Sequence, residues 1–373
     1  MRTVIVFFAG NERGGAAAHI TTHARTVARS EKRHHYHFVS LGDGPLTASV
    51  VSTSVKSVVI AAGAVGGMRQ LKQYLRTIHN PLLHAHGPRL NILAALAAKQ
   101  VNVPWTSTIH SHPYFDFMGS RLKSRIYPRL NIWSLQKAIG LFVVQSALAD
   151  ALPVKTVLDV PNAIDLPALQ EPREAYATQL KERLQLPLST RFIGMAARFD
   201  PVKNIDVLIR AIAKLTSDDT HLLLAGDGPE RQTLEALVSQ LGLQDRVHFL
   251  GFLTDMPAFY AALDVHVLPS KSEGTPFSML EAGHYGVVNV GSDIPSLREL
   301  LRDGEAGPVV PVGDVESLAQ RLDELSQNET LRQRYVQNFH TQVLPHFAPE
   351  KMLEAYERGY TVLEEDILRS GRY

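Results

Sequence analysis

The sequence predicts an α/β protein of two domains, each built on its own parallel sheet. The chain has 373 residues, which is too many for one ordinary core and suits two domains of roughly 150–190 residues each. Short apolar strands alternate with longer helical segments, and this alternation runs along the chain twice. Between the two runs, residues 166–190 contain Pro167, Pro172 and Pro187 among many charges, which indicates a linker.

The strands expected in the first domain, residues 1–165, are mostly β-branched or aromatic runs without polar alternation. This pattern is typical of parallel strands that are covered on both faces. Amphipathic helices are expected between several of them, for example at Ala16–Ala28, Arg89–Lys99 and Arg121–Ala138. The expected strands are Thr3–Ala9, Tyr36–Leu41, Ser57–Ala61, Leu82–His86, Trp105–His110, Leu141–Gln145 and Thr156–Val160.

The second domain, residues 191–349, repeats the pattern after a helix expected at Arg173–Leu184 within the linker. Its expected strands are Phe192–Ala196, His221–Ala225, Val247–Leu250, Val265–Pro269, Val287–Val290 and Pro308–Val310. Its expected helices are Asn204–Lys214, Pro229–Leu241, Met256–Leu263, Phe277–Tyr285 and Val315–Gln327, followed by a helical tail from Glu329 that is broken near Pro345 and Pro349. Right-handed crossovers between such strands build an open parallel sheet, so two Rossmann-like domains facing a cleft are predicted.

Composition narrows the classes of function. The 38 basic and 37 acidic side chains give a net charge of +1, so overall electrostatics do not indicate a nucleic-acid partner. The absence of cysteine excludes a disulfide framework, a thiolate zinc site and a cysteine nucleophile, and it is compatible with a reducing cytoplasm. The apolar run at residues 1–10 is too short to span a bilayer and is expected to be a buried strand, and no transmembrane helix is expected elsewhere.

Ligands of open parallel sheets bind outside the carboxyl ends of the strands, so the loops there are the candidate sites. The loop at residues 10–19 contains Gly14 and Gly15 just before a helix, where free amides and an open backbone can meet a phosphate or a hydroxyl. The alternative, a helix start that merely needs a tight turn, is the more ordinary interpretation of this loop. Its spacing does not match the dinucleotide or Walker fingerprints.

Two loops of the second domain contain glycine or cationic residues. Arg198 and Lys203 flank a short loop that enters a helix, and two cations aimed at one spot suit a diphosphate. The alternative is a pair of solvated cations, but cations are unfavourable at a helix N-terminus unless an anion is present. The loop at residues 226–230 indicates a turn, with backbone contact to a nucleotide base as the lesser alternative.

The loop at residues 270–282 carries two carboxylates, Glu273 in the loop and Glu281 in the following helix. Such carboxylates can accept hydrogen bonds from separate hydroxyl groups of one ligand. Loop amides at Gly274, Thr275 and Phe277 can meet a phosphate, and Pro276 suits a first helical turn. For either glutamate alone, a capping or surface role is the plausible alternative.

The second-domain motifs resemble those of the retaining glycosyltransferases of family 4, which have the two-domain GT-B fold. The pattern Glu-Gly-x-Pro-x-x-x-x-Glu-Ala is matched at every fixed position from Glu273 to Ala282. The Arg/Lys pair of that family falls on Arg198 and Lys203. Its glycine-rich first loop falls on Gly14-Gly15, its domain-junction signature appears as Pro161-Asn162-Ala163-Ile164-Asp165, and its first-domain histidine appears in Thr108-Ile109-His110.

The resemblance implies roles for these residues. Glu281 would bind the donor ribose, and Glu273 would hold a hydroxyl of the transferred sugar. Arg198 and Lys203 would neutralise the diphosphate, with Gly14, Gly15 and residues 274–277 also on the donor. His110 would contact the donor sugar near the reacting centre and orient the acceptor.

The resemblance also implies a front-face mechanism without a metal, and no Asp-x-Asp motif is present. The tail, about residues 350–373, would cross back onto the first domain, as in relatives. Ala197 replaces the glycine that usually precedes the arginine. Ala163 replaces the junction glycine, so the backbone twist that glycine allows there is not expected. No role is assigned to His284 or Tyr285, and no metal site to His112.

One basic segment raises the question of a membrane. Residues 117–149 contain no acid, and aromatic and aliphatic side chains are interspersed among the cations. The interpretations are weak contact of residues 117–139 with an anionic bilayer, or an ordinary crossover helix with a solvated basic face. The cations are Arg121, Lys123, Arg125, Arg129 and Lys137, and the apolar residues are Phe117, Leu122, Ile126, Tyr127 and Trp133.

The leading hypothesis is a retaining hexosyltransferase that moves a sugar from a UDP-sugar, or alternatively a GDP-sugar, to a cell-surface polysaccharide or lipid-linked acceptor. It would work in the cytoplasm, at the inner face of the plasma membrane, with no metal or other cofactor. One alternative is a GT-B enzyme with a small soluble acceptor such as a sugar phosphate. The other is a non-catalytic subunit that binds a nucleotide-sugar.

Overall fold

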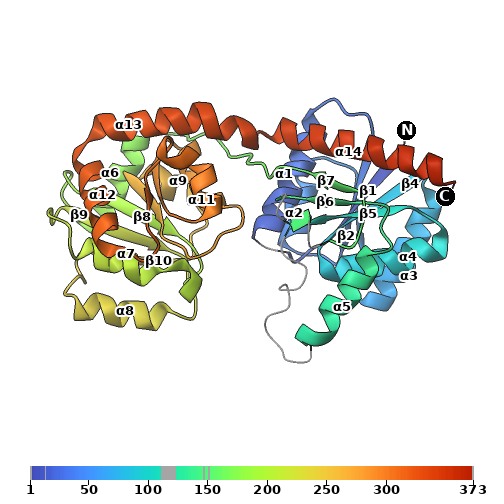
Figure 1. Ribbon diagram of the computed structural model, residues 1–373, viewed down its shortest axis with the longest axis horizontal. Coiled ribbons are helices and arrows are strands. Elements are labelled where there is room, and N and C mark those ends of the chain that lie inside the picture. Colours follow the sequence, from blue (N-terminus) through green and yellow to red (C-terminus); the bar gives the residue numbers. More distant parts are fainter. Residues whose placement is uncertain (1, 13, 111–122, 146–147, 150–151, 372–373) are drawn as a thin grey trace. The chain divides into compact units, whose positions relative to one another are not determined.

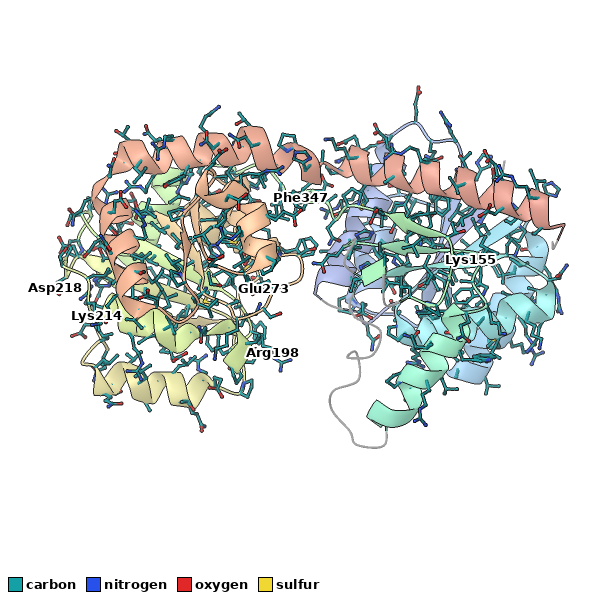
Figure 2. All side chains as sticks on the ribbon, in the orientation of Figure 1. Lys155, Arg198, Lys214, Asp218, Glu273 and Phe347 are labelled. Atoms are coloured by element: carbon teal, nitrogen blue, oxygen red, sulfur yellow. The ribbon has the colours of Figure 1, made fainter. Side chains whose placement is uncertain are left out.

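The computed structural model describes residues 2–12, 14–110, 123–145, 148–149 and 152–371 (Figure 1). The side chains of the described residues are drawn on the ribbon in Figure 2. The chain forms two compact units. The first consists of Met1–Asp165 together with Phe347–Tyr373, and the second of Leu166–His346. Each unit is a parallel-sheet α/β domain of the Rossmann-like kind.

The sheet of the first unit has seven parallel strands in the order β3-β2-β1-β4-β5-β6-β7. The strand order reverses at β1, which pairs with β2 on one side and β4 on the other. Such a switch point is where the loops at the carboxyl edge diverge and leave room for a ligand. The strands are β1 Thr3–Ala9, β2 His35–Leu41, β3 Ser57–Ile60, β4 Pro81–His86, β5 Trp105–Ile109, β6 Leu141–Val143 and β7 Val157–Asp159.

Helices connect these strands, and the tail of the chain returns to this unit. The long helix α14, Pro349–Ser370, packs on α1 of the first unit. The other helices are α1 Gly15–Arg29, α2 Pro45–Val51, α3 Ala64–Thr77, α4 Pro88–Val101 and α5 Lys123–Leu135.

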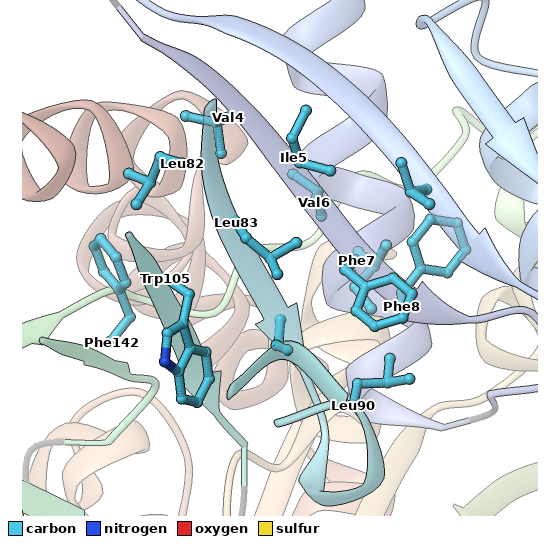
Figure 3. Close-up of a cluster of buried hydrophobic side chains, with 14 of the residues drawn as sticks. Val4, Ile5, Val6, Phe7, Phe8, Leu82, Leu83, Leu90, Trp105 and Phe142 are labelled. Atoms are coloured by element: carbon cyan, nitrogen blue, oxygen red, sulfur yellow. The ribbon is translucent and has the colours of Figure 1, made fainter. Parts of the chain in front are cut away.

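The core of the first unit surrounds β1. Residues 4–8 are five consecutive apolar residues, Val-Ile-Val-Phe-Phe, and every one is buried. Successive side chains of a strand point to opposite faces, so a continuous buried run requires helices on both faces of the sheet. Figure 3 shows these side chains packed with Leu82, Leu83, Trp105 and Phe142 of the neighbouring strands.

The sheet of the second unit has six parallel strands in the order β10-β9-β8-β11-β12-β13. The order again reverses at its first strand, β8. The strands are β8 Arg191–Ala196, β9 Thr220–Ala225, β10 Val247–Gly251, β11 Val265–Leu268, β12 Val288–Ser292 and β13 Val309–Val310.

The helices of the second unit include short 3₁₀ and π turns. The α-helices are α6 Arg173–Leu184, α7 Ile205–Ile212, α8 Arg231–Gln240, α9 Met256–Ala261, α10 Phe277–His284, α11 Pro295–Leu300, α12 Val315–Gln327 and α13 Glu329–Asn338. The turns are η2 Pro201–Lys203, η3 Arg302–Gly304, η4 Phe339–Val343 and η5 Leu344–Phe347. Along the described residues, no helix combines the length and the apolar character needed to cross a membrane.

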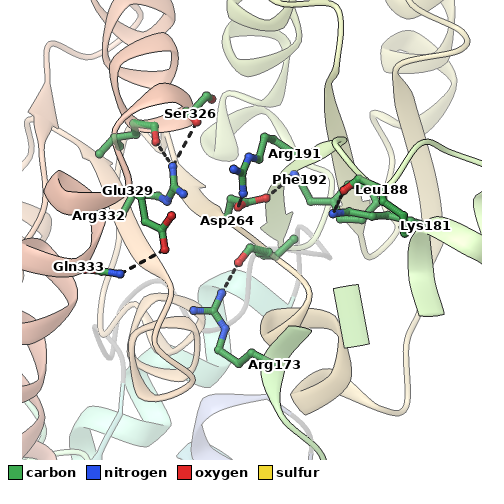
Figure 4. Close-up of polar contacts among 12 residues, drawn as sticks. Arg173, Lys181, Leu188, Arg191, Phe192, Asp264, Ser326, Glu329, Arg332 and Gln333 are labelled. Carbon is green, nitrogen blue, oxygen red and sulfur yellow. Dashed lines mark hydrogen bonds and ion pairs between the residues drawn. The ribbon is translucent and has the colours of Figure 1, made fainter. Parts of the chain in front are cut away.

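The segment expected as a linker, residues 166–190, lies within the second unit. Its helix α6 packs on α9 and buries Leu180 in the second core. The guanidinium of Arg173 donates hydrogen bonds to the carbonyls of Ala261, Leu263 and Gly286. Figure 4 shows Arg173 among the polar contacts that fasten this segment, with Lys181 bonded to the carbonyl of Leu188. The prolines and charges of this segment therefore do not make it a free connection.

Candidate functional site

An ion pair joins two loops at the carboxyl edge of the second sheet. Lys203, in the turn after β8, places its Nζ 2.7 Å from Oε1 of Glu273, in the loop after β11. The side chain of Glu273 is only 9% exposed. The amide of Lys271 donates to the carbonyl of Val202 at 2.8 Å, so the two loops are also fastened through their backbones. The structure thus brings together two residues that the sequence placed in separate motifs.

Arg198 lies in the same loop as Lys203 but makes a different contact. Its Nε is 3.2 Å from Oδ2 of Asp200, and its side chain is 72% exposed. Both Arg198 and Glu273 are labelled in Figure 2. An exposed guanidinium held by one carboxylate keeps donors available for an anion.

Glu281 lies in α10 and is largely buried. Tyr260 of α9 donates a hydrogen bond to its carboxylate, and burial raises the pKa of Glu281 above its ordinary value. The sequence does not predict this role of Tyr260, because no local pattern connects it to a residue in the next helix. The neighbouring Tyr285 hydroxyl donates to the carbonyl of Pro167 at 3.0 Å, and burial raises the pKa of Tyr285 to about 12.

The loop before α10 is tightly folded. The helix begins at Phe277, and Pro276 precedes its first residue instead of occupying the first turn. The amide of Phe277 donates to the carbonyl of Thr275 at 2.9 Å, so this amide already has an acceptor within the loop. Ser296 donates to the carbonyl of Glu273 at 3.1 Å and steadies the loop from α11.

The glycines at residues 226–228 have a structural reason. Gly226 has φ of +127°, and a Cβ there would lie 1.9 Å from the carbonyl oxygen of Ala197. A Cβ on Gly228 would lie 2.3 Å from the carbonyl oxygen of Phe199. The close approach of the two loops therefore needs glycine at both places, in agreement with the turn interpretation.

The two alanines that replace family glycines are accommodated without strain. Among the described residues with positive φ, neither Ala163 nor Ala197 is found. Ala163 is buried in the first core, and the amide of Ala197 bonds the carbonyl of Ala225 at 3.0 Å. The backbone twist that glycine would permit at these places is not used here.

A cavity of about 340 Å³ lies at the carboxyl edge of the first sheet. It opens where β1, β4 and β5 end and where α1 and α4 begin. Gly14 caps the start of α1 with φ of +74°, and Gly15 is its first residue, next to the cavity wall. The polar side chains of the wall are Asn11, Glu12, His86, Arg89, Asn91, Thr108, His110 and Asn131.

His110 directly follows β5 and lines this cavity. Its Nε2 is 3.1 Å from Nδ1 of His86, the last residue of β4. Burial lowers the pKa of both histidines well below the ordinary value, so both rings are neutral at physiological pH. Within the described residues, no group of three or more His, Cys, Asp or Glu residues is arranged to hold a metal, and His112 lies outside them.

Behind His110, a buried polar network joins the helix α1, the junction motif and the C-terminal helix. His19 Nδ1 lies 2.9 Å from Oδ1 of Asn162, and its Nε2 lies 2.7 Å from the hydroxyl of Tyr356. The Tyr356 hydroxyl is 2.8 Å from Oγ1 of Thr108. Asn162, which the sequence placed in a junction signature, thus anchors a core histidine.

The network continues to β4. His84 Nε2 is 2.8 Å from Oγ1 of Thr108, and its Nδ1 is 2.6 Å from the hydroxyl of Tyr360. No sequence signal predicted this network, because its members are scattered from residue 19 to residue 360. Only the strand order brings them together.

The basic segment considered for membrane contact is described in part. Helix α5 exposes the large apolar side chains Tyr127, Leu130 and Trp133. Phe117, Arg121 and Leu122 lie outside the described residues.

Comparison with known proteins gives consistent matches to both units of the chain. The model of Glycosyltransferase Family 4 matches residues 13–166, and the model of Glycosyl transferases group 1 matches residues 177–341. The chain is 32% identical over 292 residues to the N-acetyl-alpha-D-glucosaminyl L-malate synthase of Bacillus anthracis, covering 76% of each chain. It is 32% identical over 266 residues to the phosphatidyl-myo-inositol mannosyltransferase of Mycobacterium leprae, covering 68% of this chain and 66% of that protein.

Solved structures show the same fold. The Anabaena Alr3699/HepE protein, solved in complex with UDP, matches with a TM-score of 0.78 at 18% identity. The match covers 97% of this chain and 100% of that chain. The neighbours of this chain among solved structures are GT-B glycosyltransferases, so its two Rossmann-like domains are those of the GT-B fold.

Proposed function

This chain belongs to glycosyltransferase family 4, and on that premise we propose that it is a retaining enzyme that uses a nucleotide diphosphate sugar without a metal. The transferase class and an acceptor among sugars and lipids follow from the family and the relatives. The preferred acceptor is a cell-surface polysaccharide or a lipid-linked saccharide.

The observation that carries the proposal is the pairing of Lys203 with Glu273 at the carboxyl edge of the second sheet. A bound diphosphate would share the Lys203 ammonium with Glu273 and would also bind the exposed Arg198. These two cations would offset the negative charge that grows on the leaving group. Glu273 would then be free to accept a hydrogen bond from a hydroxyl of the transferred sugar.

The proposed reaction proceeds on one face of the sugar. The bond from the anomeric carbon to the phosphate oxygen breaks, and the acceptor oxygen bonds to the same face of that carbon. The acceptor proton passes to the departing phosphate oxygen, so no protein carboxylate is needed as a nucleophile. The neutral His110 is suited to hold the donor sugar and the acceptor by hydrogen bonds.

UDP is the favoured nucleotide, and GDP is the alternative. Support comes from the Anabaena protein of the same fold, which was solved with UDP and with UDP-glucose. Glu281 would bind the ribose hydroxyls of the donor.

The test is a thermal-shift screen of UDP-, GDP-, dTDP- and ADP-sugars in the presence of EDTA. A ligand at a hundredfold excess over its Kd stabilises the folded state by about 2.7 kcal/mol, which is readily visible. One nucleotide series is expected to stabilise the wild type and the control Glu299→Ala, an exposed carboxylate on α11, but not Glu281→Ala. Stabilisation that is seen only when EDTA is replaced by a divalent metal contradicts the metal-free proposal.

A small soluble acceptor is the second candidate. The relative from Bacillus anthracis acts on L-malate by its name, and the cavity of about 340 Å³ suits a molecule of modest size. An acceptor screen with the donor found above separates this candidate from a polymeric or lipid acceptor. Donor hydrolysis that is lost in Glu273→Ala identifies an enzyme, and its absence in the wild type favours a nucleotide-sugar-binding subunit.

Contact with a membrane is the last part of the proposal. The exposed Tyr127, Leu130 and Trp133 lie on a basic helix, and aromatic side chains with cations favour an anionic bilayer surface. The protein would then work at the cytoplasmic face of the plasma membrane. Sedimentation with phosphatidylglycerol vesicles at low salt tests this part, and no binding at any salt concentration excludes it.

A further inference from the structure

The first-unit cavity is surrounded by groups that favour negative charge. Helices α1 and α4 both begin at its wall and have 15 and 14 residues. Neither helix has an acidic residue in its first turn or a side-chain cap. The first amides of α1 and the dipoles of both helices therefore present partial positive charge to this space. In α4 the first residue is Pro88, which has no amide proton, and the amides of Leu90 and Asn91 donate to the carbonyl of Gly87.

Arg89 adds a full positive charge at the same place. It lies in the first turn of α4, where a cation is unfavourable unless an anion is close by. Its Nη2 donates to the backbone carbonyl of Ala62 at 3.2 Å, and the side chain is exposed. Glu12 supplies the carboxylate among the described wall residues and already has a contact of its own. The formal charges of Arg89 and Glu12 cancel, so the helix N-termini leave the cavity wall with partial positive charge.

His86 provides an independent sign of a ligand. Its side chain is 4% exposed and lines the cavity, and its Nδ1 is taken by His110. Its Nε2 is buried and has no hydrogen-bond partner among the described residues. A buried ring nitrogen without a partner is costly, and a hydroxyl of a bound molecule would satisfy it. His84, stacked on the same ring, has both nitrogens bonded within the protein.

We propose that the acceptor of this cavity carries a phosphate, which Arg89 and the first amides of α1 hold, while Nε2 of His86 bonds a neighbouring hydroxyl. That the ligand is the acceptor rests on the proposed function, whereas the binding of an anion in this cavity does not. The volume of about 340 Å³ lies at the small end of ligand pockets and suits a polyol phosphate. The anion can belong to a free molecule or to a lipid headgroup.

The test is calorimetric titration with glycerol 3-phosphate, with glycerol as the uncharged probe. UDP is kept saturating, because it would occupy the cations proposed for the donor in the second unit. The wild type is expected to bind glycerol 3-phosphate and not glycerol. In Arg89→Gln the affinity is expected to fall at least tenfold, since a charge-assisted contact is lost. The control Arg76→Gln, an exposed arginine in the last turn of α3, is expected to bind as the wild type.

A second measurement follows His86 directly. The ¹⁵N shift of His86 Nε2 is expected to move on addition of glycerol 3-phosphate, whereas both nitrogens of His84 stay unchanged. Dihexanoyl phosphatidic acid distinguishes the sources: tighter binding than glycerol 3-phosphate assigns a lipid, and equal binding assigns a free phosphate.

No binding of either phosphate probe, or binding that Arg89→Gln leaves unchanged, overturns the proposal. The donor screen with UDP-sugars is independent of these residues. A negative phosphate result beside a positive donor screen therefore rejects the anionic acceptor alone.

Discussion

Acidification should unfold the first unit through its buried histidines. Burial lowers the pKa of His19 to about 4 and that of His23 to about 3, from an ordinary value of 6.5. Between pH 6.5 and these lowered pKa values, His19 and His23 bind protons in the unfolded chain but not in the folded chain. The stability is fully present above pH 6.5 and is lost as the pH falls from 6.5 towards 4 for His19 and towards 3 for His23.

The magnitude follows from these two values. Between pH 7 and pH 5, a histidine whose folded pKa is two units or more below its unfolded value costs about 2 kcal/mol. His19 and His23 together remove about 4 kcal/mol over that range. This is a large part of the total of about 5–15 kcal/mol that is typical of a domain.

His23→Phe isolates one of these contributions. Both ring nitrogens of His23 are buried without a partner among the described residues, and the ring stacks on Tyr356 at 4.6 Å. Phenylalanine keeps the ring and removes the titrating nitrogens, so the loss between pH 7 and pH 5 should shrink by about 2 kcal/mol. The matched variant His19→Phe removes a titrating ring too, but it breaks the hydrogen bonds to Asn162 and Tyr356 and should lower stability at pH 7 by about 0.5–1.5 kcal/mol per bond.

Tryptophan fluorescence reports this unit alone. The chain has two tryptophans, Trp105 and Trp133, and both belong to the first unit. Urea unfolding at pH 7, 6 and 5 gives the stability of each variant. If His23→Phe loses as much stability as the wild type between pH 7 and pH 5, the assignment of a neutral, unpartnered His23 is refuted.

Three further predictions concern the second unit. Lys203→Gln leaves the nearly buried Glu273 without its cation, so thermal unfolding should show a loss of about 2 kcal/mol and no donor-induced shift; a wild-type donor shift would contradict this. Tyr260→Phe removes a bond that lowers the pKa of Glu281, so the carboxylate should protonate at higher pH, and calorimetry should find UDP affinity reduced more at pH 6 than at pH 8. Gly226→Ala, at φ of +127°, should cost about 3 kcal/mol or more in circular-dichroism melts, and an unchanged melting temperature would show that the loop yields.

The sheets were predictable from local pattern, and some helices were not. Continuous apolar runs such as residues 4–8 identify strands covered on both faces, and the helix at Arg173–Leu184 was predicted at its observed bounds. Helices α2 and α3 were not predicted. Helix α3 begins Ala-Val-Gly-Gly, and two glycines in the first turn look like a loop in sequence. Tertiary packing explains this glycine in the helix: Gly67 lies against Leu41, where a Cβ on residue 67 would clash.

The segment predicted as a linker lies within the second unit. The charges and prolines of residues 166–190 indicate a linker between two domains. Arg173, however, uses its charge on three backbone carbonyls of the second unit, and Leu180 enters the second core. A sequence does not reveal whether an arginine faces water or carbonyl groups, because the acceptors lie about 90 residues or more away along the chain.

The candidate site was likewise predictable from sequence only in part. The rule that ligands lie at carboxyl edges was enough to direct attention to Lys203 and Glu273, which prove to be paired. Tyr260 beside Glu281 and His86 beside His110 escaped notice, since each depends on which elements are neighbours.

The buried network explains why the first-unit cavity needs Arg89. With Oδ1 of Asn162 as acceptor, His19 donates from Nδ1 and accepts from Tyr356 at Nε2. These hydrogen bonds hold the His19 ring in one neutral tautomer. A proton added at Nε2 would face the proton that Tyr356 donates, so the two donors would repel each other. His86 and His110 share this burial and stay neutral, so they offer hydrogen bonds and no charge. An anion in the cavity must therefore be balanced by Arg89 and the helix N-termini, and its binding should not depend on imidazole protonation near neutral pH.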